Sequence, residues 1–301
     1  MVQFPPKMNK ALNDRMHKRW DALMETEGAA LGLSCCRPFL ENKLINDIFY
    51  EGVFNGVPCI VKCSSRAPDS ILNEAAMGER LYATDPSVFP RVLAHFRTED
   101  GKCAFVVSQK ASGPSFATLC QNPERMEQQV ADGFAADLLR IASVLRRTGI
   151  VHRDINPYNL FLDEDGHLKL IDCQFSVDRN DYRESEFMRK NWKYLYIVFS
   201  FNLNLGGAAW NDIHALRRLI QMMPQTERVK EAIAVLDEEV PTSLFTIPMP
   251  RSVRWRLRAY YASLHIQRLF RRTSAKGDVI EKRIACAKAL LKKMPDHALA
   301  P

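Results

Sequence analysis

The sequence predicts an α+β protein of two lobes, in which a small β-rich lobe precedes a larger helical one. Strand-like runs broken by glycine fill residues 44–62, and shorter apolar runs follow at 89–93 and 104–107. After a turn-rich connection at residues 110–114, long helical patterns begin with residues 130–148. This change of pattern places the boundary between the lobes near residue 110.

Glycines and capping residues mark the ends of the expected elements in the first lobe. Gly52 and Gly56 interrupt the β-rich stretch, which predicts two strands joined by a hairpin. The apolar residues of 69–81 recur at helical spacing, and Asp69 or Ser70 is a suitable cap for that helix.

The second lobe carries similar signals. Gly149 follows the helix 130–148 and suits the left-handed position at a helix end. Residues 161–162 and 168–171 read as the strands of a short hairpin whose turn is Asp165-Gly166.

Four segments describe the expected organisation. They are a helical leader at residues 1–37, a β-rich lobe at 38–110, a helical lobe at 111–250 and a basic helical segment at 251–301. With 47% hydrophobic and 26% charged residues, the chain has the composition of a soluble globular protein rather than a disordered one.

No signal in the sequence indicates export or a membrane span. The densest apolar run, residues 194–201, is far shorter than the roughly 20 residues that a span needs, and we interpret it as a buried helix. We therefore expect a cytoplasmic protein whose eight cysteines are reduced core thiols rather than a disulfide or zinc framework.

Positive charge is concentrated near the C-terminus. Residues 251–293 contain thirteen lysines or arginines and two acids, which gives this segment a charge of +11. Because the net charge of the whole chain is +7, the remainder carries −4. Such a segment either faces a phosphate-rich partner, such as an acidic lipid or an anionic glycan, or is an ordinary solvated helical face. We expect no nucleic-acid partner, because no aromatic stacking motif of a known RNA module accompanies the charge.

Three polar residues have the types and the order that phosphoryl transfer requires. The reaction needs a carboxylate near the attacking hydroxyl, metal ligands that bridge the phosphates, and a cation on the phosphates that are not transferred. Asp154 and Asn159 are spaced as in the pattern H-R-D-x-x-x-x-N, and Asp172 follows a predicted strand, where its oxygens could hold Mg²⁺.

At this point the sequence resembles the protein-kinase superfamily, over about residues 44–172. Lys62 ends a predicted strand as the kinase lysine does, and Glu74 lies in the following helix, where the family has the glutamate that pairs with that lysine. Residues 106–110 look like the hinge that holds adenine through backbone groups, which implies nucleotide contacts at Val107 and Gln109.

The resemblance implies a two-lobed protein-kinase-like fold that uses ATP and Mg²⁺. Asp154 would orient the acceptor hydroxyl, Asn159 and Asp172 would hold the metal, Lys62 would bind the α- and β-phosphates, and Glu74 would fix Lys62. Each of these residues alone has a structural explanation, as a turn cap or a solvated charge. Their order in the chain favours a catalytic site, whereas His152 is interpreted as a residue that packs the loop.

Several departures from the family pattern narrow the expected branch. No G-x-G-x-x-G precedes Lys62, and residues 42–52 would have to cover the phosphates without it. Asp172-Cys173-Gln174 stands where the family has Asp-Phe-Gly, and nothing in the sequence makes Cys173 a nucleophile. The residue two after Asp154, usually lysine in Ser/Thr kinases, is Asn156.

These losses, together with residues 190–206, look like the bacterial lipopolysaccharide core sugar kinases, which have a basic, aromatic helix after a short polar segment. The aspartate that those kinases carry in this helix is not evident here. Asp212 is the alternative candidate, for the helix-anchoring role that an aspartate has in protein kinases.

We therefore expect a phosphotransferase that acts on a sugar hydroxyl of an envelope glycan or glycolipid, in lipopolysaccharide biosynthesis. It would work in the cytoplasm, with peripheral contact to anionic membrane at its inner face. A Ser/Thr protein kinase with a protein acceptor is the alternative, supported by the arginine of His152-Arg153-Asp154. A pseudokinase scaffold is a third reading, for which the missing glycine loop is the main argument.

Overall fold

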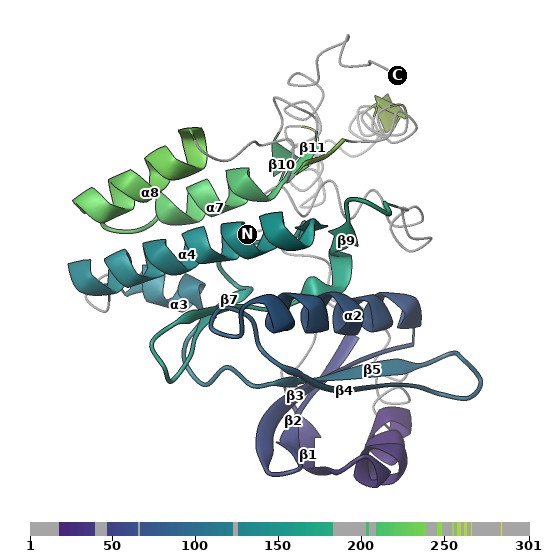
Figure 1. Ribbon diagram of the computed structural model, residues 1–301. Coiled ribbons are helices and arrows are strands. Elements are labelled where there is room, and N and C mark those ends of the chain that lie inside the picture. The colour runs from purple at the N-terminus through teal and green to yellow at the C-terminus, as the bar shows by residue number, and fades with distance from the viewer. Residues whose placement is uncertain are drawn as a thin grey trace. The chain divides into compact units, whose positions relative to one another are not determined.

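The computed structural model describes residues 18–39, 47–65, 67–122, 126–182, 203–204, 209–238 and 246–248, together with residues 255, 258, 259, 262, 263, 266 and 284. The chain forms two compact units (Figure 1). The first unit consists of Met1–Leu119 and Tyr158–Ser176, and the second of Cys120–Pro157 and Val177–Pro301. An antiparallel sheet in the first and packed helices in the second confirm the expected α+β, protein-kinase-like fold.

A five-stranded antiparallel sheet in the order β1-β2-β3-β5-β4 forms the centre of the first unit. Its strands are β1 (Leu33–Pro38), β2 (Asp47–Phe54), β3 (Val57–Ser64), β4 (Val92–Arg97) and β5 (Ala104–Gln109). The predicted hairpin joins β2 to β3, with Phe54 opposite Val57. Its two turn residues, Asn55 and Gly56, both have positive φ, 47° and 85°, which is the backbone of the tight turns that suit twisted hairpins.

The prediction for the strand at residues 89–93 was wrong in its position. Pro90 has no N–H to give to a ladder, and β4 begins only at Val92. Phe89 is instead a buried side chain in the connection before the strand. The strand then runs to Arg97 through partly exposed residues that an apolar pattern does not mark.

Helix α2 (Pro68–Thr84) packs on one face of this sheet (Figure 1). Ile71 and Ala75 contact Ala104 and Val106 of β5. The helix begins before the expected caps at Asp69 or Ser70, because Pro68 occupies its first turn and Ala67 is the cap residue.

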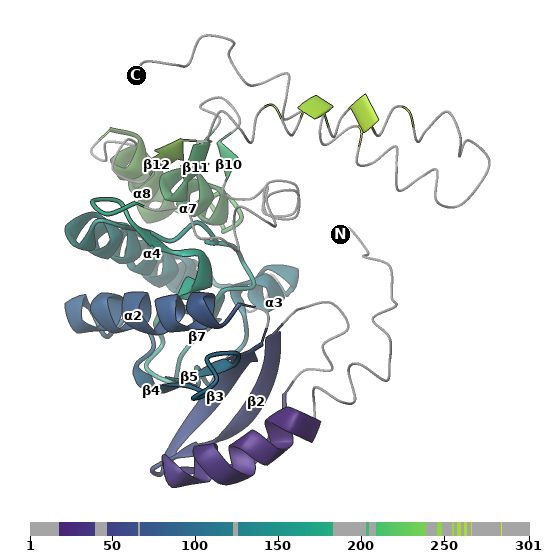
Figure 2. The same ribbon diagram turned by 90° about the vertical axis from the view of Figure 1, so that its right-hand side faces the viewer.

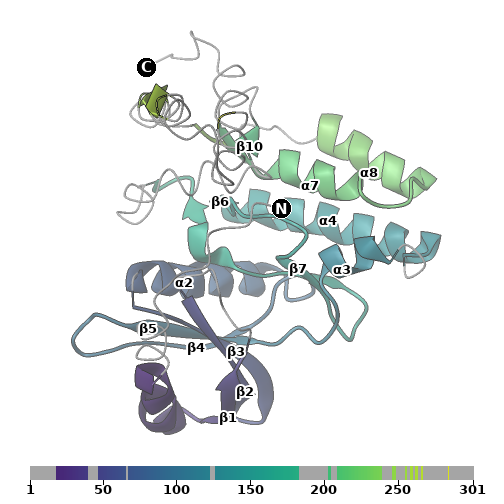
Figure 3. The ribbon, with the colours of Figure 1, turned by 180° about the vertical axis from the view of Figure 1, so that it is seen from behind.

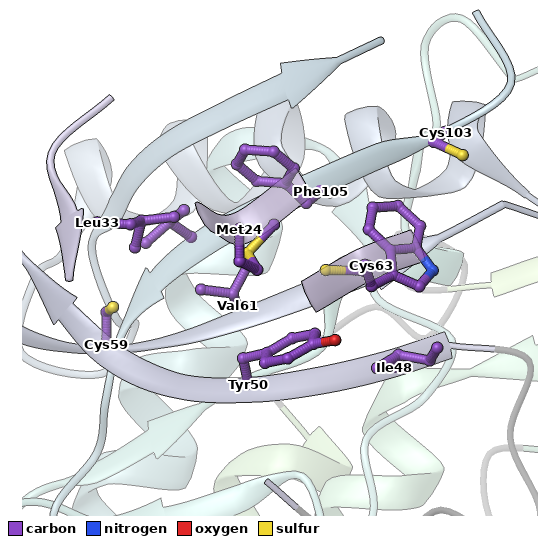
Figure 4. Close-up of a cluster of buried hydrophobic side chains, with 11 residues drawn as sticks. Met24, Leu33, Ile48, Tyr50, Cys59, Val61, Cys63, Cys103 and Phe105 are labelled. Atoms are coloured by element: carbon purple, nitrogen blue, oxygen red, sulfur yellow. The ribbon is translucent and has the colours of Figure 1, made fainter. Parts of the chain in front are cut away.

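A helix at residues 18–30, which includes the π-helical turn η1 (Met24–Gly28), covers the opposite face of the sheet. Figure 2 shows this helix, in purple, beside strands β2 and β3. Trp20 and Met24 pack with Tyr50, Val61 and Phe105 in the core cluster of Figure 4. The described part of the leader expected at 1–37 thus contains this helix and most of β1, and both belong to the sheet layer.

The second unit contains α4 (Gln128–Thr148), α7 (Asp212–Ile220) and α8 (Glu227–Glu238), which pack against one another (Figure 3). Gly149 ends α4 in the left-handed conformation, with φ 69°, as its position in the sequence predicted. The short strands are β6 (Ile150–Val151), paired with β9 (Val177–Asp178), and the sheet of β10 (Leu203–Asn204), β11 (Ala209–Asn211) and β12 (Thr246–Pro248). Helix α3 (Phe116–Gln121) spans the point where the first unit passes into the second.

The second predicted hairpin is present in the first unit, as β7 (Leu160–Leu162) and β8 (Leu168–Leu170). Gly166 lies in its turn with φ 80°. The strand β8 leads to Asp172 and the 3-10 turn η3 (Cys173–Phe175).

Two expectations fall largely outside the described residues. Of the helix expected at 190–206, only Leu203 and Asn204 are described, and they form a strand rather than a helix. Of the basic segment 251–301, only seven residues are described, all helical. Within the described residues, no helix has the length and apolar character needed to cross a membrane.

Candidate functional site

A cavity of about 340 Å³ lies in the first unit, where the sheet, α2 and the β7–β8 hairpin meet. Its walls are mostly apolar and aromatic, with a small number of charged groups. The residues that line it include Phe39, Phe49, Ile60, Lys62, Glu74, Ser108, Gln109, Lys110, Ala111, Asn159, Phe161, Ile171 and Asp172. A cavity of this size and character is typical of a small-molecule or cofactor site.

Strand alternation places Lys62 in this cavity. Along β3, Val61 and Cys63 belong to the core beneath the helix 18–30, whereas Ile60 and Lys62 line the cavity. Successive side chains of a strand point to opposite faces of the sheet. The lysine is therefore buried beside α2, with only 6% of its side chain exposed.

Two carboxylates contact the Lys62 ammonium. Its Nζ lies 2.9 Å from Glu74 Oε2 on α2 and 2.7 Å from Asp172 Oδ1 after β8. Buried charges are expected to be paired, because an isolated buried charge is costly. The three groups together carry one net negative charge, which suits a site that receives a metal cation.

Asp172 and Asn159 come from the neighbouring ends of the β7–β8 hairpin. The Ile171 N–H donates to the Asn159 carbonyl oxygen at 2.9 Å, and both side chains line the cavity. Asp172 has φ 67°, in the left-handed region that non-glycine residues rarely adopt. The structure thus brings together four of the predicted site residues, Lys62, Glu74, Asn159 and Asp172.

The structure places the side chain of Val107 away from the cavity, so the contact predicted for this residue would have to come from its backbone. Its side chain is fully buried in the core cluster, opposite Val61, and does not line the cavity. Because the sheet alternates, the neighbouring Ser108 lines the cavity instead, followed by Gln109, Lys110 and Ala111. Gln109 thus lines the cavity, and its contact with a nucleotide stays a prediction.

Two phenylalanines of the cavity escaped the sequence interpretation. Phe49 lies on β2 with its ring 5.8 Å from Lys62 Nζ, and the Phe39 ring lies 5.9 Å from Lys110 Nζ. The Phe39 N–H donates to the Phe49 carbonyl oxygen at 2.8 Å. The alternation of Phe49 with the core residue Tyr50 was a signal in the sequence that could have identified it. From Asp47 onward, the expected phosphate-covering stretch 42–52 is strand β2 rather than a loop.

Cys173, next to Asp172, has no character of a nucleophile. Burial raises the pKa of its thiol far above the usual range, and the nearby Glu74 and Asp172 carboxylates raise it further. The polar groups of the cavity best suited to chemistry are therefore the Lys62 ammonium and the oxygens of Glu74, Asn159 and Asp172.

In the second unit, Asp212 holds the backbone of the histidine motif. Its carboxylate accepts hydrogen bonds from the His152 N–H at 2.6 Å and the Arg153 N–H at 3.0 Å. Asp212 is the first residue of helix α7, and Asn211 caps this helix, since its Oδ1 accepts a hydrogen bond from the His214 N–H. Complete burial raises the pKa of Asp212 to about 7, although the two N–H donors and Arg153 oppose the rise. The alternatives for the anchoring residue were an aspartate within residues 190–206, which is not evident in the sequence, and Asp212. These contacts support Asp212.

Asp154 is oriented by its own loop. Asn156 Nδ2 donates to Asp154 Oδ1 at 2.9 Å and to the Asp154 carbonyl oxygen at 3.1 Å. The Asp154 N–H donates to His152 Nδ1 at 3.3 Å, a contact that fits the structural role expected for this histidine. Arg153 is buried with φ 68° and stacks on the Tyr182 ring at 5.6 Å. The polar contacts of Asn156 explain how an asparagine can serve at this position of the loop.

The fold is protein-kinase-like, and comparisons with known proteins support the kinase-like superfamily. The sequence profile of the RIO domain matches residues 107–204. A serine/threonine-protein kinase of Arabidopsis thaliana is 28% identical over 181 residues, which cover 55% of this chain and 35% of the relative. Protein kinase G11A of Oryza sativa subsp. indica is 27% identical over 193 residues, 58% of this chain and 32% of the relative.

A shorter and more similar match is the cAMP-dependent protein kinase catalytic subunit of Schizosaccharomyces pombe, 36% identical over 78 residues, 26% of this chain and 15% of the relative. The chain spans about a third or less of the length of these relatives. All three carry names of protein kinases, which supports the kinase-like superfamily.

Proposed function

We propose that the protein transfers the γ-phosphoryl group of ATP to a serine or threonine hydroxyl of a protein. The observation that carries the proposal is the contact of the buried Lys62 ammonium with the carboxylates of Glu74 and Asp172 in the lining of an apolar cavity. A cation between two carboxylates, beside walls that can hold an aromatic base, matches the needs of phosphoryl transfer.

The cavity fits a nucleotide by its chemistry. Ile60, Phe161 and Ile171 offer apolar surface for the base, and the backbone of Ser108–Ala111 offers polar groups beside it. Lys62 would contact the phosphates that stay with the leaving group, and Glu74 would hold the ammonium in place through the 2.9 Å contact. With a volume of about 340 Å³, the cavity is of the size that typically holds such ligands.

Mg²⁺ fits the residues beside Lys62. Asp172 and Asn159 supply the carboxylate and amide oxygens that a hard cation prefers, and they line one cavity. When bound, the metal would neutralise charge on the phosphates. In this proposal Asp172 and Asn159 hold the cation, and Asp154 orients the acceptor hydroxyl through a carboxylate that Asn156 steadies.

A protein acceptor is preferred over a sugar for two reasons. The relatives named above are protein kinases, and the contacts of Asp212 with the His152 and Arg153 N–H groups give it an anchoring position, the role considered for it in the protein-kinase alternative. The expected branch of lipopolysaccharide core sugar kinases rests on residues 190–206, which are described only at Leu203 and Asn204. An envelope glycan is the second acceptor to be tested beside protein.

The test is transfer of labelled phosphate from ATP to two acceptor panels, Ser/Thr peptide libraries and envelope glycolipid extract. We expect incorporation into peptides, and loss of it in Asp154→Asn by roughly 10²–10⁴-fold, the usual contribution of a positioned base. Nucleotide binding by this variant should stay close to that of the wild type. Labelling of glycolipid alone would reverse the choice of acceptor, and labelling of neither panel would favour a pseudokinase.

A further inference from the structure

Polar side chains of α2 hold the segment that follows Asp172. Ser70, Asn73 and Glu74 lie three and four residues apart and share one face of the helix. Gln174 Nε2 donates to Ser70 Oγ at 2.9 Å. Asn73 Nδ2 donates to the Gln174 carbonyl oxygen at 3.3 Å and to the Ser176 carbonyl oxygen at 2.8 Å.

The Gln174–Ser70 contact is buried, and the two Asn73 contacts are partly buried. Gln174 is 6% exposed, Ser70 is 8% and Ser176 is 1%. The Ser70 hydroxyl donates to the Ala67 carbonyl oxygen at 2.7 Å, so its oxygen lone pair is available to Gln174. A buried polar group that loses its partner keeps the full desolvation penalty. Moving the segment away from α2 would therefore break one buried and two partly buried hydrogen bonds at once.

The segment needs such support because it contains a strained residue and no glycine. Asp172 has φ 67° without the conformational freedom of glycine, and Cys173-Gln174 follows it. Strained conformations persist where the surroundings over-determine them. Lys62 holds the Asp172 side chain from one side, and the Asn73 and Gln174 contacts hold the backbone that follows it.

We propose that Asn73 and Gln174 are positioning residues that lock α2 to residues 172–176, so that the Asp172 carboxylate stays directed to the metal and Lys62. The proposal rests on the proposed function for the role of Asp172. It implies that α2 and this segment move as one body, and that a glycine at the position of Gln174 would weaken the site rather than assist it.

Cys173 provides a reporter of the lock that does not depend on activity. Cys173 is 5% exposed and lies at the edge of the cavity between Asp172 and Gln174, so a reagent reaches its thiol slowly until the segment opens. Cys59 and Cys63 are fully buried in the core on the other face of the sheet. They report global unfolding in the same sample.

The experiment is pulsed alkylation followed by peptide mass spectrometry, on wild type, Asn73→Ala and Gln174→Met. Methionine has nearly the volume of glutamine but cannot donate to Ser70. We expect Cys173 to be labelled roughly tenfold faster or more in both variants, with Cys59 and Cys63 unchanged, because only the local opening is made easier. Glu79→Gln, an exposed change on the same helix, is the matched control and should label like the wild type.

A second readout is the Mg²⁺ dependence of phosphotransfer. Both variants should need roughly tenfold more Mg²⁺ for half-maximal rate and show a lower kcat, with the KM for ATP changed less, since only Asp172 is displaced. Unchanged labelling of Cys173 would overturn the lock. Labelling of Cys59 and Cys63 along with Cys173 would reduce it to a general stabilising contact, and faster Cys173 labelling with unchanged Mg²⁺ dependence would refute the positioning role.

The two proposals fail in different ways. If the wild type transfers no phosphate but Cys173 opens in the variants as expected, the proposed function fails and the lock stands. If transfer occurs and Cys173 labelling does not respond to either substitution, the function stands and the lock fails.

Discussion

Lys62 is the residue on which the candidate site is centred. The carboxylates around it both hold the lysine in place and set the charge of the site. Glu74 comes from α2 and Asp172 from the end of a hairpin, yet both lie within 3 Å of its Nζ. Because a buried ammonium without a partner is costly, the two carboxylates hold the lysine in place as well as creating the charge of the site. Removing one of them should therefore affect function without leaving Lys62 unpaired.

We expect Asp172→Ala to lower affinity for Mg²⁺ and ATP together by about tenfold or more, because it removes a direct carboxylate ligand of a hard cation. Nucleotide binding without metal should fall much less, since Lys62 keeps its contact with Glu74. Calorimetric titration with and without Mg²⁺ measures both, and Asp154→Asn serves as the comparison. Equal Mg·ATP affinity in wild type and the Asp172 variant would remove this residue from the metal site.

Asp212 makes a prediction about stability and pH. Its pKa is near 3.8 when unfolded and is raised to about 7 by burial in the fold. The folded state therefore binds the proton more tightly, so this group stabilises the fold fully below pH 3.8, and its contribution is lost as pH rises through 7. Between pH 4 and 7, the free energy of unfolding of the wild type should fall relative to Asp212→Asn by at most about 1.4 kcal/mol per pH unit.

Denaturant unfolding at several pH values measures this difference. Asp212→Asn also loses one acceptor for a backbone N–H, which lowers the free energy of unfolding by the same amount at every pH. This loss does not affect the test, because only the slope of the free energy of unfolding against pH is compared. A difference between the two proteins that does not change between pH 4 and 7 would show that Asp212 stays ionised in the fold.

At the scale of elements, helix ends decide where the motif residues fall. Helix α4 ends at Gly149, and the chain then enters β6 and the His152 loop. The left-handed backbone at Gly149 is open to glycine and strained for other residues, and a Cβ there would lie 3.0 Å from Asn180 Nδ2. The direction of the loop thus depends on one residue at the end of a helix.

Gly149→Ala should destabilise the protein by about 1 kcal/mol, because alanine at positive φ is strained. Gly133 supplies a matched control in the same helix. It is exposed with nothing within 4 Å of an added Cβ, so Gly133→Ala should stabilise by up to about 1 kcal/mol through helix propensity. Urea unfolding of both variants checks the pair, and two changes of the same sign would contradict the argument.

At the scale of the whole molecule, the charge distribution leads to a prediction about residues 251–293, called the tail here. Residues 251–293 carry +11 against −4 for the rest of the chain. Near an anionic membrane each such charge is worth about 1 kcal/mol, and the attraction weakens with salt because the Debye length is about 8 Å at physiological ionic strength. The tail would then bring the enzyme to acceptors at that surface.

Replacing six tail charges by glutamine should weaken sedimentation with anionic vesicles and leave Mg·ATP affinity unchanged. The six are Arg268, Arg271, Arg272, Lys288, Lys292 and Lys293. The control removes the same charge from exposed residues elsewhere, namely Arg19, Arg37, Arg80, Arg91, Lys102 and Lys230. If the wild type does not bind vesicles at low salt, or both variants lose binding equally, the tail is an ordinary solvated face.

The sequence by itself determined the order of the elements and gave the candidate residues for phosphate and metal binding. Period-2 and helical spacing located the β2–β3 hairpin, α2 and α4, because these patterns reflect burial on one face of each element. The sequence was sufficient to pick out five candidate residues, because each lies in or after a recognisable strand, helix or motif. They are Lys62, Glu74, Asp154, Asn159 and Asp172.

Only the tertiary structure decided which side chains meet. Sequence spacing cannot show that Val107 faces the core and Ser108 the cavity, because an apolar strand reads alike on both faces. It also could not pair Asn73 with Ser176, or Asp212 with His152, residues 103 and 60 positions apart. Contacts over such separations depend on how the elements pack, and local pattern carries no information about that packing.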